Sequence, residues 1–191
     1  MRHWIIAGVM AVMLCWGSQT VSAAPNVSED VYQWIQSTAR ANYYFNKQQI
    51  CFAVDKDGYI DLDTLIVPTL RTYDDVQIKD VVDKRRWKMA SVDGYSDLVG
   101  EAEYLKIQRS KRIVSVEETD DLDSTWSTLT AEYPKQEIEL DKLAAKNVDR
   151  VFYEAILTYA EKHQDEIIKQ TKGTLRPAAD AQKGHNRKRK V

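Results

Sequence analysis

Histidine and cysteine are scarce in this sequence, with three and two residues respectively in a chain of 191. Removal of an amino-terminal segment, argued below, takes Cys15 away and leaves Cys51 as the lone cysteine, beside His163 and His185. One cysteine cannot form an internal disulfide, so packing has to stabilise the core. Cys51 lies in an apolar run and is expected to be an inert core thiol, with an intermolecular bridge or a reactive thiol as the alternatives. Two histidines distant in sequence indicate neither a catalytic triad nor a metal site, so we predict no catalytic residues and no cofactor.

The amino-terminal segment has the pattern of a cleavable export signal. The basic residue Arg2 precedes the uncharged run Trp4–Trp16, and small residues lead up to Ala23. This run is shorter than the about 20 apolar residues that a membrane-spanning helix needs. We therefore predict a signal peptide over residues 1–23, no transmembrane segment after cleavage, and an extracytoplasmic location in the periplasm, at the cell surface or secreted. An uncleaved amphipathic anchor is the alternative, whereas lipid attachment at Cys15 is disfavoured by the large residues that precede it.

Charge is divided unevenly between the body of the chain and its end. Seven basic residues and one acid lie from Lys172 onward, so this end carries +6; the whole chain carries −2 and Arg2 contributes +1, which leaves −9 for residues 24–171. Composition predicts a disordered basic tail over residues 174–191. An acidic, exported body argues against a nucleic-acid partner. The candidates for binding an anionic lipid or cell-wall polymer are the last basic residues of the tail, Arg187, Lys188, Arg189 and Lys190.

Hydrophobic periodicity predicts one α+β domain over residues 24–173. Its expected architecture is a small antiparallel sheet of about four to six strands, flanked by an N-terminal and a C-terminal helix. Pro68 is expected to end the second strand. The expected elements are a helix over residues 28–46, strands over 50–54, 59–67, 76–82, 86–92 and 126–130, a hairpin that pairs 102–108 with 112–118, and a helix from 148 to about 172.

The turn that begins at Asp55 carries the closest approach to a metal-binding motif. Its Asp-x-Asp-Gly pattern, Asp55 to Gly58, is similar to the middle of a calcium-binding loop. Such a loop needs ligands at both ends, but the corresponding positions hold Ala53 and Thr64. We therefore expect a plain hairpin turn and no metal site, with weak cation binding by Asp55, Asp57 and Asp61 as the alternative.

Three further patterns have mainly structural interpretations. The acidic run Glu117–Asp123 is expected to be a solvated loop, and Lys84–Lys88 a charge cluster at the end of a strand. Tyr43 and Tyr44 adjoin Phe45, and three successive aromatic residues cannot all face inward on one helix. Tyr43 and Tyr44 are therefore candidates for surface contact with protein or sugar.

The order of several short motifs resembles that of surface-adhesin protein E-like exported bacterial proteins, over roughly residues 52–126. The resemblance implies a small antiparallel sheet with helix cover and a role in attachment to host or matrix proteins, and it supplies no catalytic residues. The chain departs from this family in lacking a cysteine pair that some members use and in its long basic tail. The motifs are Gly58–Leu65 with its Tyr-Ile-Asp, the strand Val76–Val82, the pair Glu103–Lys106 and Arg112–Ser115, and Asp120–Trp126 behind it.

The sequence thus predicts an exported, non-enzymatic binding or adhesion-type domain of the bacterial envelope or surface, with a protein or envelope-polymer partner. The alternative is an envelope structural or interaction protein that its basic tail holds to anionic polymer or lipid. A hydrolase that uses carboxylates alone, drawn from Asp61, Asp63 or the run 117–123, is the third possibility. Oligomeric state does not follow from the sequence.

Overall fold

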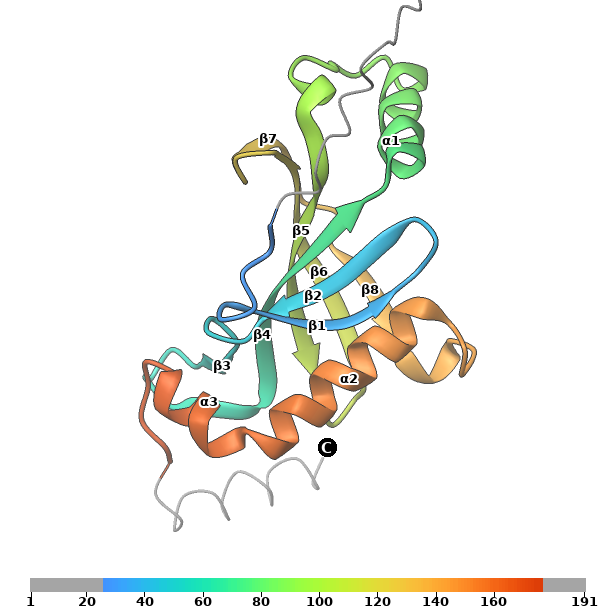
Figure 1. The fold of residues 1–191 in the computed structure, drawn as a ribbon. Helices are drawn as coiled ribbons and strands as arrows, with labels where there is room; N and C mark the ends of the chain where they lie inside the picture. The colour runs from blue at the N-terminus through green and yellow to red at the C-terminus, as the bar shows by residue number, and fades with distance from the viewer. Residues whose placement is uncertain (1–25, 177–191) are drawn as a thin grey trace, which may run out of the picture.

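The computed structural model describes residues 26–176, in which eight strands pair antiparallel in one sheet (Figure 1). The strand order is β1-β2-β4-β5-β6-β7, with β3 beside β4 and β8 beside β6. The predicted α+β class is confirmed. The predicted four to six strands and the N-terminal helix are wrong, for reasons given below. The strands are β1 (Tyr32–Ser37), β2 (Ala41–Asn46), β3 (Cys51–Val54), β4 (Ile60–Tyr73), β5 (Leu98–Gln108), β6 (Ile113–Asp123), β7 (Thr128–Glu132) and β8 (Gln136–Glu139); the helices are α1 (Asp75–Trp87), α2 (Val148–Lys162) and α3 (Gln164–Gln170), with short 3-10 turns at Tyr95–Asp97 and Leu140–Lys142.

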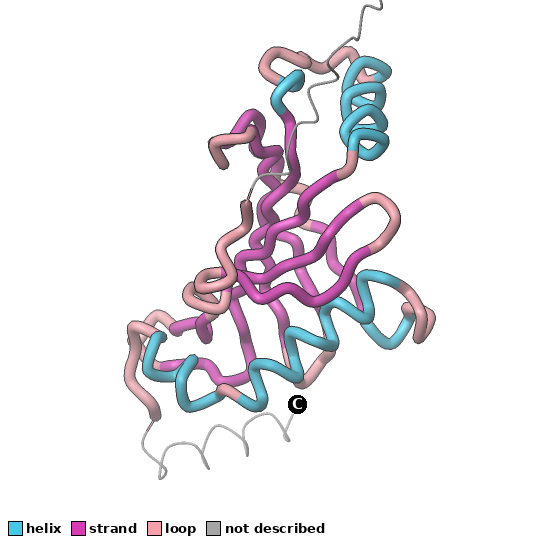
Figure 2. The backbone as a smooth tube through the Cα atoms, viewed as in Figure 1, coloured by secondary structure: helices cyan, strands magenta, loops and turns pink. Residues whose placement is uncertain are grey.

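Residues 28–46, the predicted first helix, form the β1–β2 hairpin (Figure 2). The turn is held by the Thr38 hydroxyl, which accepts hydrogen bonds from the backbone N–H groups of Arg40 and Ala41. Aromatic side chains fit a pleated surface well, and β2 finds a partner in β4, distant in sequence. This long-range pairing outweighs an apolar spacing that is compatible with helix or strand.

The segment 76–82 was predicted as a strand and belongs instead to α1. The Asp74 carboxylate accepts a hydrogen bond from the Gln77 backbone N–H at the start of the helix, and basic residues occupy its last turn. None of the residues of α1 is buried, so no apolar stripe announces the helix in the sequence. The helix lies at the end of the molecule remote from α2 (Figure 1).

Pro68 does not end its strand, because β4 continues to Tyr73. On one side of β4 the neighbour is β3 as far as Ile66 and β2 from Thr69 onward. Pro68 lies between these two pairings, where a missing backbone N–H removes no ladder hydrogen bond on that side. The predicted strand 50–54 and the hairpin of β5 with β6 are confirmed. The extra strands include β8, whose polar sequence Gln-Glu-Ile-Glu gives little hydrophobic signal.

The core lies between one face of the sheet and the helices α2 and α3, which run along that side (Figure 1). Asn147 caps α2 by accepting a hydrogen bond from the Arg150 backbone N–H, as helix starts commonly require. The predicted C-terminal helix is confirmed, with a break at His163. The helix side chains that are buried in this core are Phe152, Tyr153, Ile156, Ala160 and Ile167.

After α3 the chain returns to the β3–β4 turn. Thr174 forms an isolated parallel bridge with Tyr59, and Arg176 pairs with the Asp55 carboxylate. In residues 26–176, no helix has the length and apolar character needed to cross a membrane. The predicted signal peptide and most of the predicted tail lie outside the described residues.

Candidate functional site

The two faces of the sheet are occupied differently. Successive strand residues point to opposite faces. Phe45 is fully buried in the core against α2, so its neighbour Tyr44 lies on the other face. We call the face opposite α2 the open face.

One register row crosses the open face through five strands. Antiparallel pairing places Trp34 of β1 beside Tyr44 of β2, Tyr44 beside Leu70 of β4, Leu70 beside Ala102 of β5, and Ala102 beside Asp120 of β6. Paired residues share a face of the sheet. The row therefore begins with two aromatic side chains, continues through a leucine and an alanine, and ends with a carboxylate.

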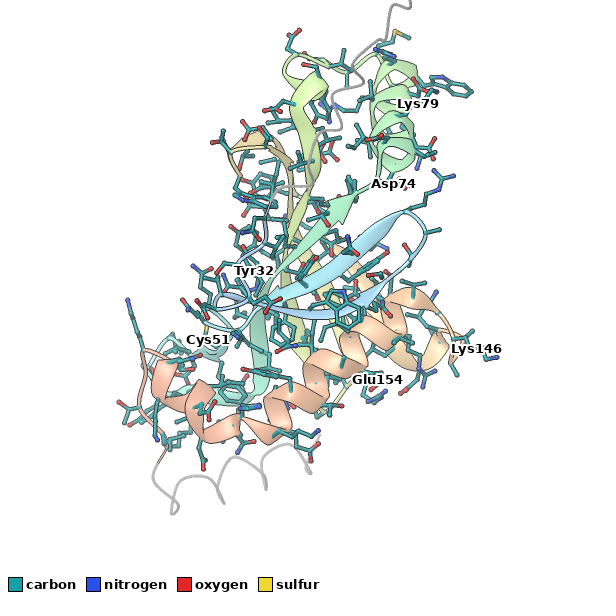
Figure 3. The ribbon with its side chains drawn as sticks, viewed as in Figure 1. Tyr32, Cys51, Asp74, Lys79, Lys146 and Glu154 are labelled. Carbon is teal, nitrogen blue, oxygen red and sulfur yellow. The ribbon has the colours of Figure 1, made fainter. Side chains whose placement is uncertain are left out.

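The middle of the open face is hollowed because its side chains there are small. Ala102 of β5, which lines the hollow, carries only a methyl group. Larger side chains around this point, among them Tyr32, Tyr104 and Trp126, line a cavity of about 360 Å³. Figure 3 shows Tyr32 near the middle of the molecule, above α2, which carries Glu154. A cavity of this volume is in the range that small ligands occupy.

The segment before β1 forms part of the cavity wall. Asn26 and Val27 line both this cavity and a neighbouring hollow of about 380 Å³. Tyr32 also lines both hollows, and Trp34 and Tyr44 line the second. The two hollows thus adjoin along one aromatic face.

Asp120 is the carboxylate of the cavity. It is 9% exposed, and its Oδ2 accepts a hydrogen bond of 3.4 Å from the Thr128 hydroxyl. Its Oδ1 is buried and has no hydrogen-bond partner among the described residues. Burial, followed by the negative charge of Glu118, raises the pKa of Asp120. A buried carboxylate oxygen without a donor is costly, so the Asp120 carboxylate is only partly satisfied by the described residues.

A tight turn places Trp126 at the cavity wall. The Asp123 carboxylate accepts hydrogen bonds of 2.9 Å from the backbone N–H groups of both Thr125 and Ser127. The Thr125 hydroxyl, followed by these backbone donors, lowers the pKa of Asp123. Trp126 takes a positive φ of 65°, which is unusual for a large residue. Its side chain remains 36% exposed and lines the cavity.

A cluster of buried charges lies on the opposite face, under the start of α2. The Arg71 guanidinium is 3.2 Å from Glu101, 3.0 Å from Glu103 and 3.6 Å from Asp149 of α2. Burial, followed by the charge of Glu103, raises the pKa of Glu101 to about 7. One arginine balances several acids here, so the cluster joins β4, β5 and α2 as a structural network.

A second arginine, Arg85, makes contacts on the face that carries the Arg71 cluster, near α1. Arg85 of α1 is 3.6 Å from Asp121 and lies over the Tyr95 ring, 4.4 Å from its centroid. The Tyr95 hydroxyl donates a hydrogen bond of 2.6 Å to Asp121. Burial, with this hydrogen bond, raises the pKa of Tyr95 to about 12. These contacts attach α1 to the sheet.

Tyr43 and Tyr44, predicted as surface-contact residues, lie on opposite faces of β2. Tyr43 packs against Phe152 of α2, with ring centroids 5.5 Å apart, and Arg71 lies over its ring. Tyr44 is half-buried on the open face. The structure thus separates the pair and leaves Tyr44 in the candidate site.

The weak metal candidates Asp55, Asp57 and Asp61 do not converge on one point. Asp55 accepts hydrogen bonds from the backbone N–H groups of Asp57 and Tyr59. Asp61 accepts from the Asp63 backbone N–H and the Thr64 hydroxyl. Within the described residues, no group of three or more His, Cys, Asp or Glu side chains is arranged to hold a metal ion.

Two other charge runs are placed differently from the sequence-based expectation. The acidic run 117–123 is part of β6, not a loop, and it supplies Asp120. The basic run 84–88 ends α1 rather than a strand, and its Trp87 is 88% exposed. The tail candidates Arg187, Lys188, Arg189 and Lys190 lie outside the described residues.

Sequence reasoning missed Asp120, Tyr104 and Trp126 as site residues. Five carboxylates in seven residues indicate a solvated segment, and the spacing of Tyr104 and Trp126 does not distinguish site residues from core residues. The alternation of Asp120 with its neighbours in a strand was the available signal, but burial of that carboxylate depends on β5 and on the segment before β1.

The chain matches no protein-family model, no curated protein and no solved structure. The resemblance to surface-adhesin protein E-like proteins therefore stays a prediction.

Proposed function

We propose that this protein is an exported, non-enzymatic binding domain that holds a protein or envelope-polymer partner on its open face. The observation that carries this proposal is the register row that leads from Trp34 and Tyr44 to Asp120. Aromatic side chains beside a hollow are enriched where proteins contact ligands, because they bury a large area while retaining polar groups. Trp34, at one end of this row, is 52% exposed and is therefore accessible to a partner.

Export and attachment to the bacterial envelope or surface are supported by the sequence of residues 1–23 and by the family resemblance. The first test is amino-terminal sequencing of the natural protein. A chain that begins at residue 24 in an extracytoplasmic fraction supports the proposal, and a chain with Met1 in the cytosol contradicts it.

Partner recognition is tested with the mature chain, residues 24–191, immobilised and exposed to envelope and host-matrix fractions. The Trp34→Ala and Tyr44→Ala double variant is expected to lose partners that the wild type retains. Trp87→Ala is the matched control, because Trp87 is exposed on α1, away from the open face. Retention that is unchanged in the double variant, or lost equally in the control, contradicts recognition by this face.

The division of charge supports a second candidate, an envelope structural or interaction protein held by its basic tail. Deletion of residues 177–191 separates the two candidates. If tail deletion abolishes retention on envelopes and high salt does the same to the full chain, electrostatic anchoring is favoured. If retention survives the deletion and depends on Trp34 and Tyr44, recognition lies on the folded body.

A further inference from the structure

We propose that the cavity beside Asp120 binds an organic cation, an alkylammonium group on an aliphatic stem. This inference rests on the proposed function, because it places the ligand on the same open face. It specifies the chemical class of ligand that this face binds. The supporting observations are a buried carboxylate oxygen, the charge of the lining and the aromatic wall.

The Asp120 carboxylate contains an acceptor oxygen that lacks a donor among the described residues. Asp120 Oδ1 is buried without a donor among the described residues, although Asp120 lines a cavity of about 360 Å³. Asp120 itself lines the cavity, and a carboxylate only accepts hydrogen bonds, so a ligand that pairs with Asp120 has to donate. An ammonium group donates up to three N–H bonds and also balances the charge, and charge-assisted hydrogen bonds are the stronger kind.

The charged side chains that line the cavity and the adjoining hollow are acidic within the described residues. Within residues 26–176, the linings of the cavity and the adjoining hollow include Asp120 and Glu29 but no Lys, Arg or His. Burial, followed by the negative charge of Glu118, raises the pKa of Asp120, and burial, followed by the charges of Asp120 and Glu118, raises the pKa of Tyr104. An anion is therefore repelled from this site, and a cation is attracted.

Aromatic side chains form part of the cavity wall. The side chains of Tyr32, Tyr104 and Trp126 line the cavity together with apolar groups such as Val31 and Leu122. Aromatic rings attract cations through their negative faces, and the apolar groups suit an aliphatic stem. Asp120, the aromatic rings and the apolar wall together match both parts of an alkylammonium ion.

The test compares three probes of equal chain length and different charge: cadaverine, pentane-1,5-diol and glutarate. Each is titrated into the folded mature chain, with binding followed by amide chemical shifts of Ala102 and Thr128, which line the cavity. We expect saturable shifts with cadaverine and none with the diol or glutarate. Equal binding of the diol, or no shifts with either cadaverine or Nα-acetyl-lysine methylamide, overturns the proposal.

Asp120→Asn keeps the volume of the side chain and removes its charge, and it is expected to weaken cadaverine binding at least about tenfold. Asp57→Asn is the matched control, because it removes one charge at an exposed position of the β3–β4 turn. Trp126→Leu is expected to weaken binding about three- to tenfold through loss of the aromatic face. Wild-type affinity in both Asp120→Asn and Trp126→Leu overturns the proposal.

Two sources could present an alkylammonium group: a free polyamine or a lysine side chain of a partner protein. Nα-acetyl-lysine methylamide serves as the probe for the second source. Binding of cadaverine alone assigns a free amine, and binding of both probes assigns a site that also accepts lysine; either result supports the proposal. If neither binds while the Trp34→Ala and Tyr44→Ala variant loses its partner, the cation site is wrong and the binding-domain proposal stands.

Discussion

Gly100 of β5 lies so close to Arg71 of β4 that a Cβ atom at position 100 would be 2.1 Å from the Arg71 carbonyl oxygen. The two strands therefore approach each other only because residue 100 has no side chain. The Arg71 side chain extends to Glu101 on the face opposite the open face.

Gly100→Ala is expected to destabilise the fold by more than about 2 kcal/mol, because the clash is with backbone that cannot move without disturbing the β4–β5 pairing. Urea unfolding measures the change. Gly58→Ala is the comparison, since Gly58 has a φ of 83° but open space around its Cβ position. We expect Gly58→Ala to cost about 1 kcal/mol. A cost for Gly100→Ala no larger than for Gly58→Ala would contradict the close approach.

Arg71→Met is expected to reduce the free energy of unfolding by about 3–5 kcal/mol. The variant leaves the carboxylates of Glu101 and Glu103 buried without their cation. Chemical denaturation measures this loss. The triple variant Arg71→Met, Glu101→Gln and Glu103→Gln removes the uncompensated charges as well, so it should recover a large part of the stability. No recovery in the triple variant would show that Arg71 acts through packing rather than charge.

Glu101 makes stability depend on pH with a defined sign. Burial raises its pKa to about 7 from an ordinary value of 4.5, with Glu103 and Asp121 adding to the effect and Arg71 and Tyr73 opposing it. Between these pH values the folded state binds more protons than the unfolded state, so this contribution to stability is present below about pH 4.5 and is lost as pH rises through 7.

Glu101→Gln should therefore gain stability relative to wild type by about 3 kcal/mol as pH rises from below 4.5 to above 7. Denaturant unfolding at several pH values gives this difference. Glu117→Gln, at an exposed position of β6, is the control and should follow the wild-type profile. A Glu101→Gln profile parallel to that of wild type would contradict the raised pKa.

Cys51 of β3 should react slowly with thiol reagents in the folded mature chain. Burial raises the pKa of its thiol, which lowers the thiolate fraction near neutral pH. Labelling with Ellman's reagent near pH 8 should be at least about tenfold slower in the folded chain than in concentrated guanidinium chloride. Equal rates in the two states would identify a reactive thiol, the alternative considered from the sequence.

Local patterns predicted the elements whose partners lie nearby in the sequence. The β5–β6 hairpin follows from alternating apolar residues on either side of Arg109–Lys111, and α2 follows from the apolar face that includes Phe152 and Tyr159. The α1 helix was missed because none of its residues is buried, so its capping residue Asp74 was the main signal. The β1–β2 hairpin was missed because its aromatic residues also fit helical spacing.

The sequence by itself determined an α+β chain with a C-terminal amphipathic helix, a lone mature cysteine under the predicted cleavage, and an acidic body with a basic tail. Only the tertiary structure decided that Trp34, Tyr44, Ala102 and Asp120 share one row, because cross-strand register joins residues that are far apart in the chain. The burial of Asp120 depends likewise on neighbouring strands and on the segment before β1. No local pattern of charges in the run 117–123 distinguishes that carboxylate from the other carboxylates of the run.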